Sequence, residues 1–134
     1  MTPSTYAAVL VTLLVAHTVA DHWVQTDAQA VAKVAAGWAG RSACLRHVAS
    51  YSVTLLVALA VINWRLGLGL DPVRVTVVLV ANAVTHYWAD RRTGLLALAR
   101  RLGKGGWLDA DPSAGYKLDQ SWHVGWLLVA ALFI

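Results

Sequence analysis

The sequence predicts an all-α integral membrane protein, a four-helix bundle built from two repeated helical hairpins in a single domain of residues 1–134. Two observations indicate this class. The chain is 58% hydrophobic and only 13% charged, whereas soluble domains use roughly 45–50% apolar and about 25% charged residues. The apolar residues also form four long runs, and a helix needs about 20 residues to cross the hydrocarbon core of a membrane.

The four apolar runs give the expected elements in order. They predict transmembrane helices over approximately residues 5–25, 44–64, 72–90 and 118–134. Asp71 and Pro72 mark the start of the third helix, because Asp is a favoured N-cap and Pro a favoured first helical residue. Between the third and fourth helices, residues 95–102 have one apolar and one basic face. This pattern predicts an amphipathic helix that lies along the lipid headgroups.

The distribution of basic residues predicts the orientation in the membrane. Nine Lys and Arg residues lie in or beside the first and third connections: Lys33, Arg41, Arg46, Arg91, Arg92, Arg100, Arg101, Lys104 and Lys117. Only Arg65 and Arg74 lie on the other side. By the positive-inside rule, the two longer connections face the cytoplasm and both termini lie outside. Anionic headgroups then account for the net charge of +4, and no nucleic-acid partner is expected.

Ionisable residues gather at one end of the predicted bundle. A charged side chain near the centre of a membrane helix costs about 2.5–3.5 kcal/mol, so such residues are expected to face the bundle interior and to have partners. An up-and-down bundle brings the C-terminal ends of helices one and three beside the N-terminal ends of helices two and four. These ends carry His17, Asp21, His22, Gln25, Arg46, His47, Thr85, His86, Asp90, Asp119, Gln120 and His123.

The spacing of these residues predicts a metal site. Each hairpin supplies a His-x3-Asp pair, in which both side chains share one helix face, and a second His at the start of its other helix. Two His and one carboxylate are the ligands of many catalytic zinc and non-haem iron sites. The predicted metal ligands are His17, Asp21, His47, His86, Asp90 and His123, with Asp119 as bridging ligand or general base. One or two divalent ions are expected: zinc, with manganese or iron as alternatives.

Other polar residues are expected to contact a substrate. The candidates for substrate binding are Gln25, Lys33, Arg91, Arg92 and Gln120. The basic third connection, which includes Arg100 and Arg101, would attract an anionic lipid headgroup. The alternative for the whole cluster is a set of plain hydrogen bonds between membrane helices, which contribute about 0.6 kcal/mol each.

The same residues carry a resemblance to a known family. The chain resembles DUF3307, a family of small bacterial and phage-borne membrane proteins with the pattern His-x3-Asp-x3-Gln, Lys, His, His-x3-Asp and Asp-Gln-x2-His. In this sequence the pattern falls on His17, Asp21, Gln25, Lys33, His47, His86, Asp90, Asp119, Gln120 and His123. Two positions depart from it: His22 replaces an apolar aromatic, and Arg91 and Arg92 stand where the family has Lys. The resemblance implies a multi-pass protein of the bacterial inner membrane.

The predicted function is that of a metal-dependent hydrolase acting on a lipid-linked or membrane-proximal phosphoester, ester or amide at the cytoplasmic face. A looser similarity to membrane proteins named metal-dependent hydrolases implies the same chemistry. Three non-enzymatic alternatives stay open. They are a proton or ion relay, a haem-binding bundle with His17 and His86 as axial ligands, and a protein that binds a membrane partner or forms a homo-oligomer.

Overall fold

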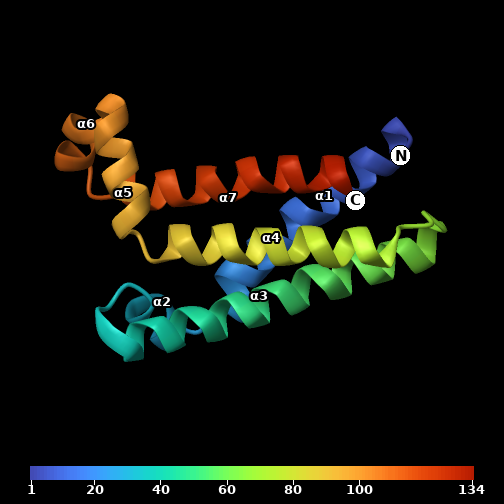
Figure 1. Ribbon diagram of the computed structural model, residues 1–134, viewed down its shortest axis with the longest axis horizontal. Coiled ribbons are helices and arrows are strands. Elements are labelled where there is room, and N and C mark those ends of the chain that lie inside the picture. The colour runs from blue at the N-terminus through green and yellow to red at the C-terminus, as the bar shows by residue number, and fades with distance from the viewer.

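The structure is a computed structural model that describes all 134 residues, and it contains helices and no strand. Four long helices follow the longest axis of the molecule (Figure 1): α1 (Pro3–Val19), α3 (Gly37–Leu66), α4 (Pro72–Asp90) and α7 (Ala114–Phe133). Short segments join them: the π-helical turn η1 (Ala20–Val24), α2 (Asp27–Ala32), α5 (Thr93–Ala99), the π-helical turn η2 (Arg100–Lys104) and α6 (Gly105–Ala110). The predicted all-α class is confirmed.

The helix ends follow from local sequence. The Asp71 side chain accepts hydrogen bonds from the first backbone N–H groups of α4, and Pro72 follows it without an N–H to satisfy. Helix α3 ends at Gly67, whose φ of +60° is the left-handed conformation that glycine adopts without a steric penalty. Helix α2 begins with a capping box between Thr26 and Gln29. These caps set the helix lengths that bring polar residues to one end of the molecule.

The four long helices pack as a ring, in which α1 contacts α3 and α7, and α4 contacts the same two helices. One half of the ring is apolar and includes Leu13, Tyr51, Leu55 and Leu127, all of them fully buried. This half lies toward the chain termini and the α3–α4 connection. Helices α2, α5 and α6 lie at the opposite end (Figure 1). The buried polar residues therefore occupy the half of the ring that these short helices border.

The outer surface of the long helices is apolar. Large hydrophobic side chains such as Val15, Val57 and Leu132 are more than half exposed. Two segments, Pro3–Val24 and Gly37–Leu66, are long and apolar enough to cross a membrane. Helices α4 and α7, of 19 and 20 residues, are not among these candidate spans. By length and composition, the molecule is therefore suited to contact lipid through at least part of its surface.

Several helix ends differ from the expected ones. The helix expected at residues 44–64 begins seven residues earlier, at Gly37, and the one expected at residues 118–134 begins at Ala114. The apolar run marks only the part of a helix that suits lipid, and Ala and Arg extend the same helix into polar surroundings. The helix expected at residues 95–102 is α5, which ends at Ala99 before the chain turns at Gly103, where φ is +81°.

Candidate metal centre

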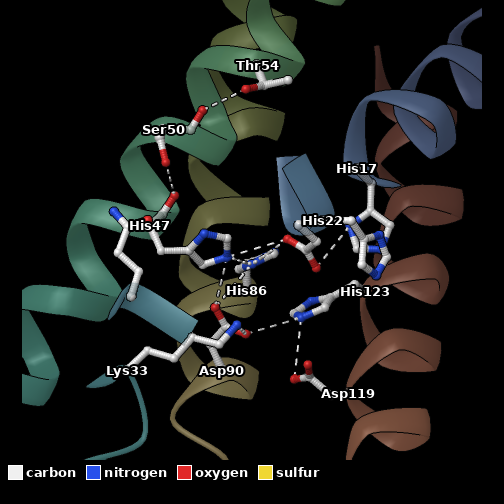
Figure 2. Close-up of polar contacts among 12 residues, drawn as sticks. His17, His22, Lys33, His47, Ser50, Thr54, His86, Asp90, Asp119 and His123 are labelled. Atoms are coloured by element: carbon white, nitrogen blue, oxygen red, sulfur yellow. Dashed lines mark hydrogen bonds and ion pairs between the residues drawn. The ribbon is translucent and has the colours of Figure 1, made fainter. Parts of the chain in front are cut away.

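Eight ionisable side chains meet in the polar half of the bundle. Each has at most 9% of its side chain exposed, and together they come from α1, η1, the end of α2, α3, α4 and α7: His17, Asp21, Lys33, His47, His86, Asp90, Asp119 and His123. Figure 2 shows the side chains of His47, His86, Asp90 and His123 pointing toward one another. The meeting of several helix ends at one side, expected from the alternating direction of the helices, is present in the structure.

The π-helical turn η1 places Asp21. Here the N–H of Gln25 donates to the carbonyl of Ala20, five residues back, so the turn is wider than an α-helical one. Asp21 faces the interior with 5% of its side chain exposed. His22, its neighbour, faces outward and bonds the hydroxyl of Tyr116. Asp21 therefore lies inside the bundle, and the adjacent His22 lies on its outer surface.

Four side-chain atoms from η1, α3 and α4 form a compact set. The Nε2 atoms of His47 and His86 are 3.1 Å apart. Oδ1 of Asp21 lies 3.4 Å from the first and 3.8 Å from the second, and Oδ2 of Asp90 lies 3.2 and 3.3 Å from them. Tetrahedral zinc bonded at about 2.0–2.2 Å holds its ligand atoms about 3.3–3.6 Å apart. The separations between the two imidazole nitrogens, and between these nitrogens and the carboxylate oxygens, are close to those that one bound ion requires. Asp21 and Asp90 belong to different metal-compatible groups, which share His86.

The two carboxylate oxygens in this set lack hydrogen-bond donors. Oδ1 of Asp21 and Oδ2 of Asp90 are both buried, and neither accepts a hydrogen bond. Buried polar atoms in folded proteins almost always have a partner, so these two acceptors, facing imidazole nitrogens, suit a cation. The imidazole of His86 is fixed by its neighbours, with its ring 3.9 Å from the rings of Tyr51 and His123. Ring packing therefore fixes the position of one member of the donor set.

A second group overlaps the first. His86, Asp90 and His123 also bring ligand atoms close enough for one ion. However, Nζ of Lys33 lies 2.7 Å from Oδ1 of Asp90, the oxygen that faces His123 at 3.6 Å. A cation already neutralises that oxygen. Nε2 of His123 lies 3.4 Å from Oδ1 of Asp119, which forms a pair beside the four-atom set.

His17 occupies a different place from the one expected for a ligand grouped with Asp21 and His47. Its Nε2 lies 3.2 Å from the side-chain oxygen of Gln120, and its Nδ1 lies 3.7 Å from Oδ2 of Asp21. Gln120 also donates to that carboxylate at 3.1 Å. His17 belongs to neither of the two metal-compatible groups, and His86, from the other hairpin, stands in its place. The helices therefore combine ligands across the hairpins, because α3 packs against α4.

The residues expected to bind substrate have varied surroundings. Arg91 donates to the backbone carbonyls of Lys33 and Ala35, which holds the end of α2 over Asp90. Arg92 forms the turn between α4 and α5 with a φ of +57°. The side-chain nitrogen of Gln25 is buried without a hydrogen-bond partner. Arg91 and Lys33 therefore already have hydrogen-bond partners within the protein.

Sequence reasoning missed two buried polar residues next to the centre. Tyr51 is fully buried and packs against the ring of His86, and Asn82 is 5% exposed. The position of each residue in the sequence could have predicted this burial beside the centre. Tyr51 lies four residues after His47, and Asn82 four residues before His86, so each shares a helix face with a predicted ligand.

The chain was compared with protein-family models, with curated proteins and with solved structures. No curated protein and no solved structure matched. A family model described as "Protein of unknown function (DUF3307)" matched residues 9–134, which include every residue of the polar cluster. Because the match covers nearly the whole chain, the protein belongs to the DUF3307 family.

Proposed function

We propose that the protein is an integral membrane four-helix bundle that binds one divalent metal ion through Asp21, His47, His86 and Asp90. The observation that carries the proposal is the separation of 3.1 Å between the two imidazole nitrogens, together with separations of 3.2–3.8 Å between these nitrogens and the two carboxylate oxygens. Two imidazoles and two carboxylates suit zinc, and also manganese or iron. His17 and His123 are then neighbours of the ion and not ligands.

The charges in the cluster support a single divalent ion. With the imidazoles in the neutral form that binds metal, ionised Asp21, Asp90 and Asp119 carry three negative charges and Lys33 one positive charge. Two negative charges remain in a buried region, where an uncompensated charge is expensive. One divalent ion makes the region neutral. A second ion would give it an excess of positive charge.

The distribution of basic and apolar residues supports the placement in the membrane. The polar half of the bundle lies beside the connections that carry nine of the eleven Lys and Arg residues. The positive-inside rule then puts this half at the cytoplasmic face, with both termini outside. The apolar outer surface of the long helices would contact the acyl chains.

The proposed chemistry is hydrolysis of a lipid-linked or membrane-proximal substrate. A bound zinc ion lowers the pKa of water from 15.7 to about 7, so a nucleophile would be available at neutral pH. Asp119 and His123 lie 3.4 Å apart beside the four-atom set, and we assign Asp119 the role of general base. Gln25, Arg92 and the basic third connection are the groups left to contact an anionic substrate.

The packing of the imidazoles argues against a haem. His17 and His86, the candidate axial ligands, both pack against His123, with ring centroids 5.6 and 3.9 Å from it. A porphyrin between the two would have to displace that ring.

The test measures metal content and hydrolysis on the same purified samples. Wild-type protein, extracted in detergent without chelator, should contain about one zinc, manganese or iron ion per chain by elemental analysis. His86→Ala removes a central ligand and should lose the ion. Asp119→Asn should keep the ion and hydrolyse a nitrophenyl phosphodiester or ester roughly 10²–10⁴-fold more slowly, because only the base is changed.

The matched control is His22→Ala, which removes an imidazole that faces outward and contacts Tyr116. It should retain both metal and activity. A metal-free wild type would disprove the metal site. Equal hydrolysis by wild type and His86→Ala would disprove the hydrolase assignment and leave the metal site standing.

A further inference from the structure

A groove lies between the short helices at the polar end and the outer face of α7. Leu95 of α5 and Leu102 of η2 form one wall, and Trp122, Gly125 and Trp126 of α7 lie on the other, enclosing about 380 Å³. Figure 1 shows α5 leaving the end of the bundle at a steep angle to α7. The residues that line the groove come from α5, η2 and α7. None of the ionisable residues of the candidate metal centre lines this groove, so it is a separate site.

We propose that this groove binds one acyl chain of an anionic phospholipid, with the headgroup beside Lys104. The proposal rests on the placement in the membrane described above and does not depend on the metal ion. Most of the lining is hydrophobic, and Lys104 is a charged residue at its edge. An apolar slot with a cationic end matches the chemistry of an anionic lipid.

The length of the groove fits one leaflet. Its lining on α7 extends from Leu118 to Val129, which is eleven residues along the helix. At about 1.5 Å per residue this is about 16 Å, and half of a hydrocarbon core of about 30 Å is about 15 Å. The slot runs from the basic end of the molecule toward the apolar half. It therefore has the length and direction of an acyl chain that starts at the cytoplasmic interface.

The charges around the groove favour an anionic headgroup. Arg100 is paired with Asp109, at 2.7 Å, and this pair ties η2 to α6. Lys104 and Arg101 are exposed and have no ion pair. Lys104 and Arg101 are therefore available to contact a phosphate at the open end of the groove, between α5 and α7.

The wall formed by α7 leaves room for a chain. At Gly125 nothing lies within 4 Å of an added Cβ, so the wall is hollow at this position. A larger residue there would fill the space that we assign to the chain.

The experiment titrates detergent-solubilised protein with phosphatidylglycerol or phosphatidylcholine of identical acyl chains and counts bound lipids by native mass spectrometry. Wild type should bind one phosphatidylglycerol at concentrations where phosphatidylcholine stays unbound. Lys104→Gln should weaken phosphatidylglycerol binding about fivefold, the equivalent of about 1 kcal/mol per basic residue. Gly125→Leu should abolish the binding, since it fills the groove.

Two matched variants serve as controls. Arg41→Gln removes an exposed charge at the same end of the molecule, and Gly106→Leu adds the same side chain at an open position outside the groove. Both should bind like wild type. Equal affinity for the two lipids, or unchanged binding by Gly125→Leu, would overturn the proposal while the metal content stays the same. Protein that dissolves without detergent would overturn the membrane placement itself.

Discussion

His86 belongs to both metal-compatible groups of the candidate centre. Its Nε2 lies 3.1 Å from that of His47 and 3.3 Å from Oδ2 of Asp90. The rings of Tyr51 and His123 pack against it on either side. Because the ring is held by packing, the position of its nitrogen depends on the surrounding apolar and aromatic residues as much as on its charged neighbours.

Gly40 permits the close approach that keeps Lys33 over Asp90. A Cβ at this position would lie 2.0 Å from the carbonyl oxygen of Ala35 and 2.8 Å from Arg91. In an open helix, Gly40→Ala would stabilise by about 0.8–1.0 kcal/mol through helix propensity. Here the clash with backbone should cost about 1–3 kcal/mol. We expect a lower thermal unfolding temperature in detergent.

Gly106→Ala is the matched control for this prediction, because nothing lies within 4 Å of its added Cβ. That variant should unfold at the wild-type temperature or slightly above it. A higher unfolding temperature for Gly40→Ala would show that the turn of residues 33–36 is not in tight contact with α3.

At the scale of elements, the turn from α6 into α7 is held by hydrogen bonds to one carboxylate, that of Asp111. Asp111 accepts hydrogen bonds from the backbone and hydroxyl of Ser113, from Trp107 of α6 and from Lys117 of α7. The Lys117 ammonium and the Ser113 groups hold the pKa of the Asp111 carboxyl well below its usual range. This residue therefore fixes how α6 turns toward α7, and the Arg100–Asp109 pair joins η2 to α6.

Asp111→Ala should loosen this segment and increase the rate of tryptic cleavage at the basic residues of η2 several-fold. The pKa is lower in the folded than in the unfolded protein, so the stabilisation is present above about pH 4 and is lost as the pH falls further. The ratio of cleavage rates for variant and wild type should then be the same at pH 6.5 and 8.

Asp109→Ala is the comparison, since Asp109 has only the exposed pair with Arg100. It should accelerate cleavage less than Asp111→Ala does. If the two variants were cleaved at equal rates, Asp111 would not be the residue that organises the turn.

At the scale of the whole molecule, polar and apolar residues are separated along the helix axes. The apolar half of the ring is filled by residues such as Leu55 and Leu127, and the polar half by the ionisable cluster. The polar half lies where α2, α5 and α6 cover the end of the bundle (Figure 1). The ionisable residues therefore gather at one end of the molecule.

The proposed orientation can be measured by cysteine labelling. In a Cys44→Ser background, Leu66→Cys reports on the α3–α4 end and Gly106→Cys on the α6 end, and both positions are exposed. A membrane-impermeant maleimide should label Leu66→Cys in spheroplasts, where the outer side is accessible. It should label Gly106→Cys only after lysis, because the basic connections face the cytoplasm. The reverse pattern would require the opposite orientation.

The sequence alone determined the helical class, the alternation of the long helices and the end of the bundle at which the ionisable residues gather. These follow from hydrophobic runs and from helix direction, which are local properties. Only the tertiary structure decided which side chains meet. His17 is turned toward Gln120, and His86 joins Asp21 and His47 from the other hairpin. The rotation of each helix about its axis and the π-helical turn at Asp21 depend on packing between helices, and spacing along one helix carries no information about it.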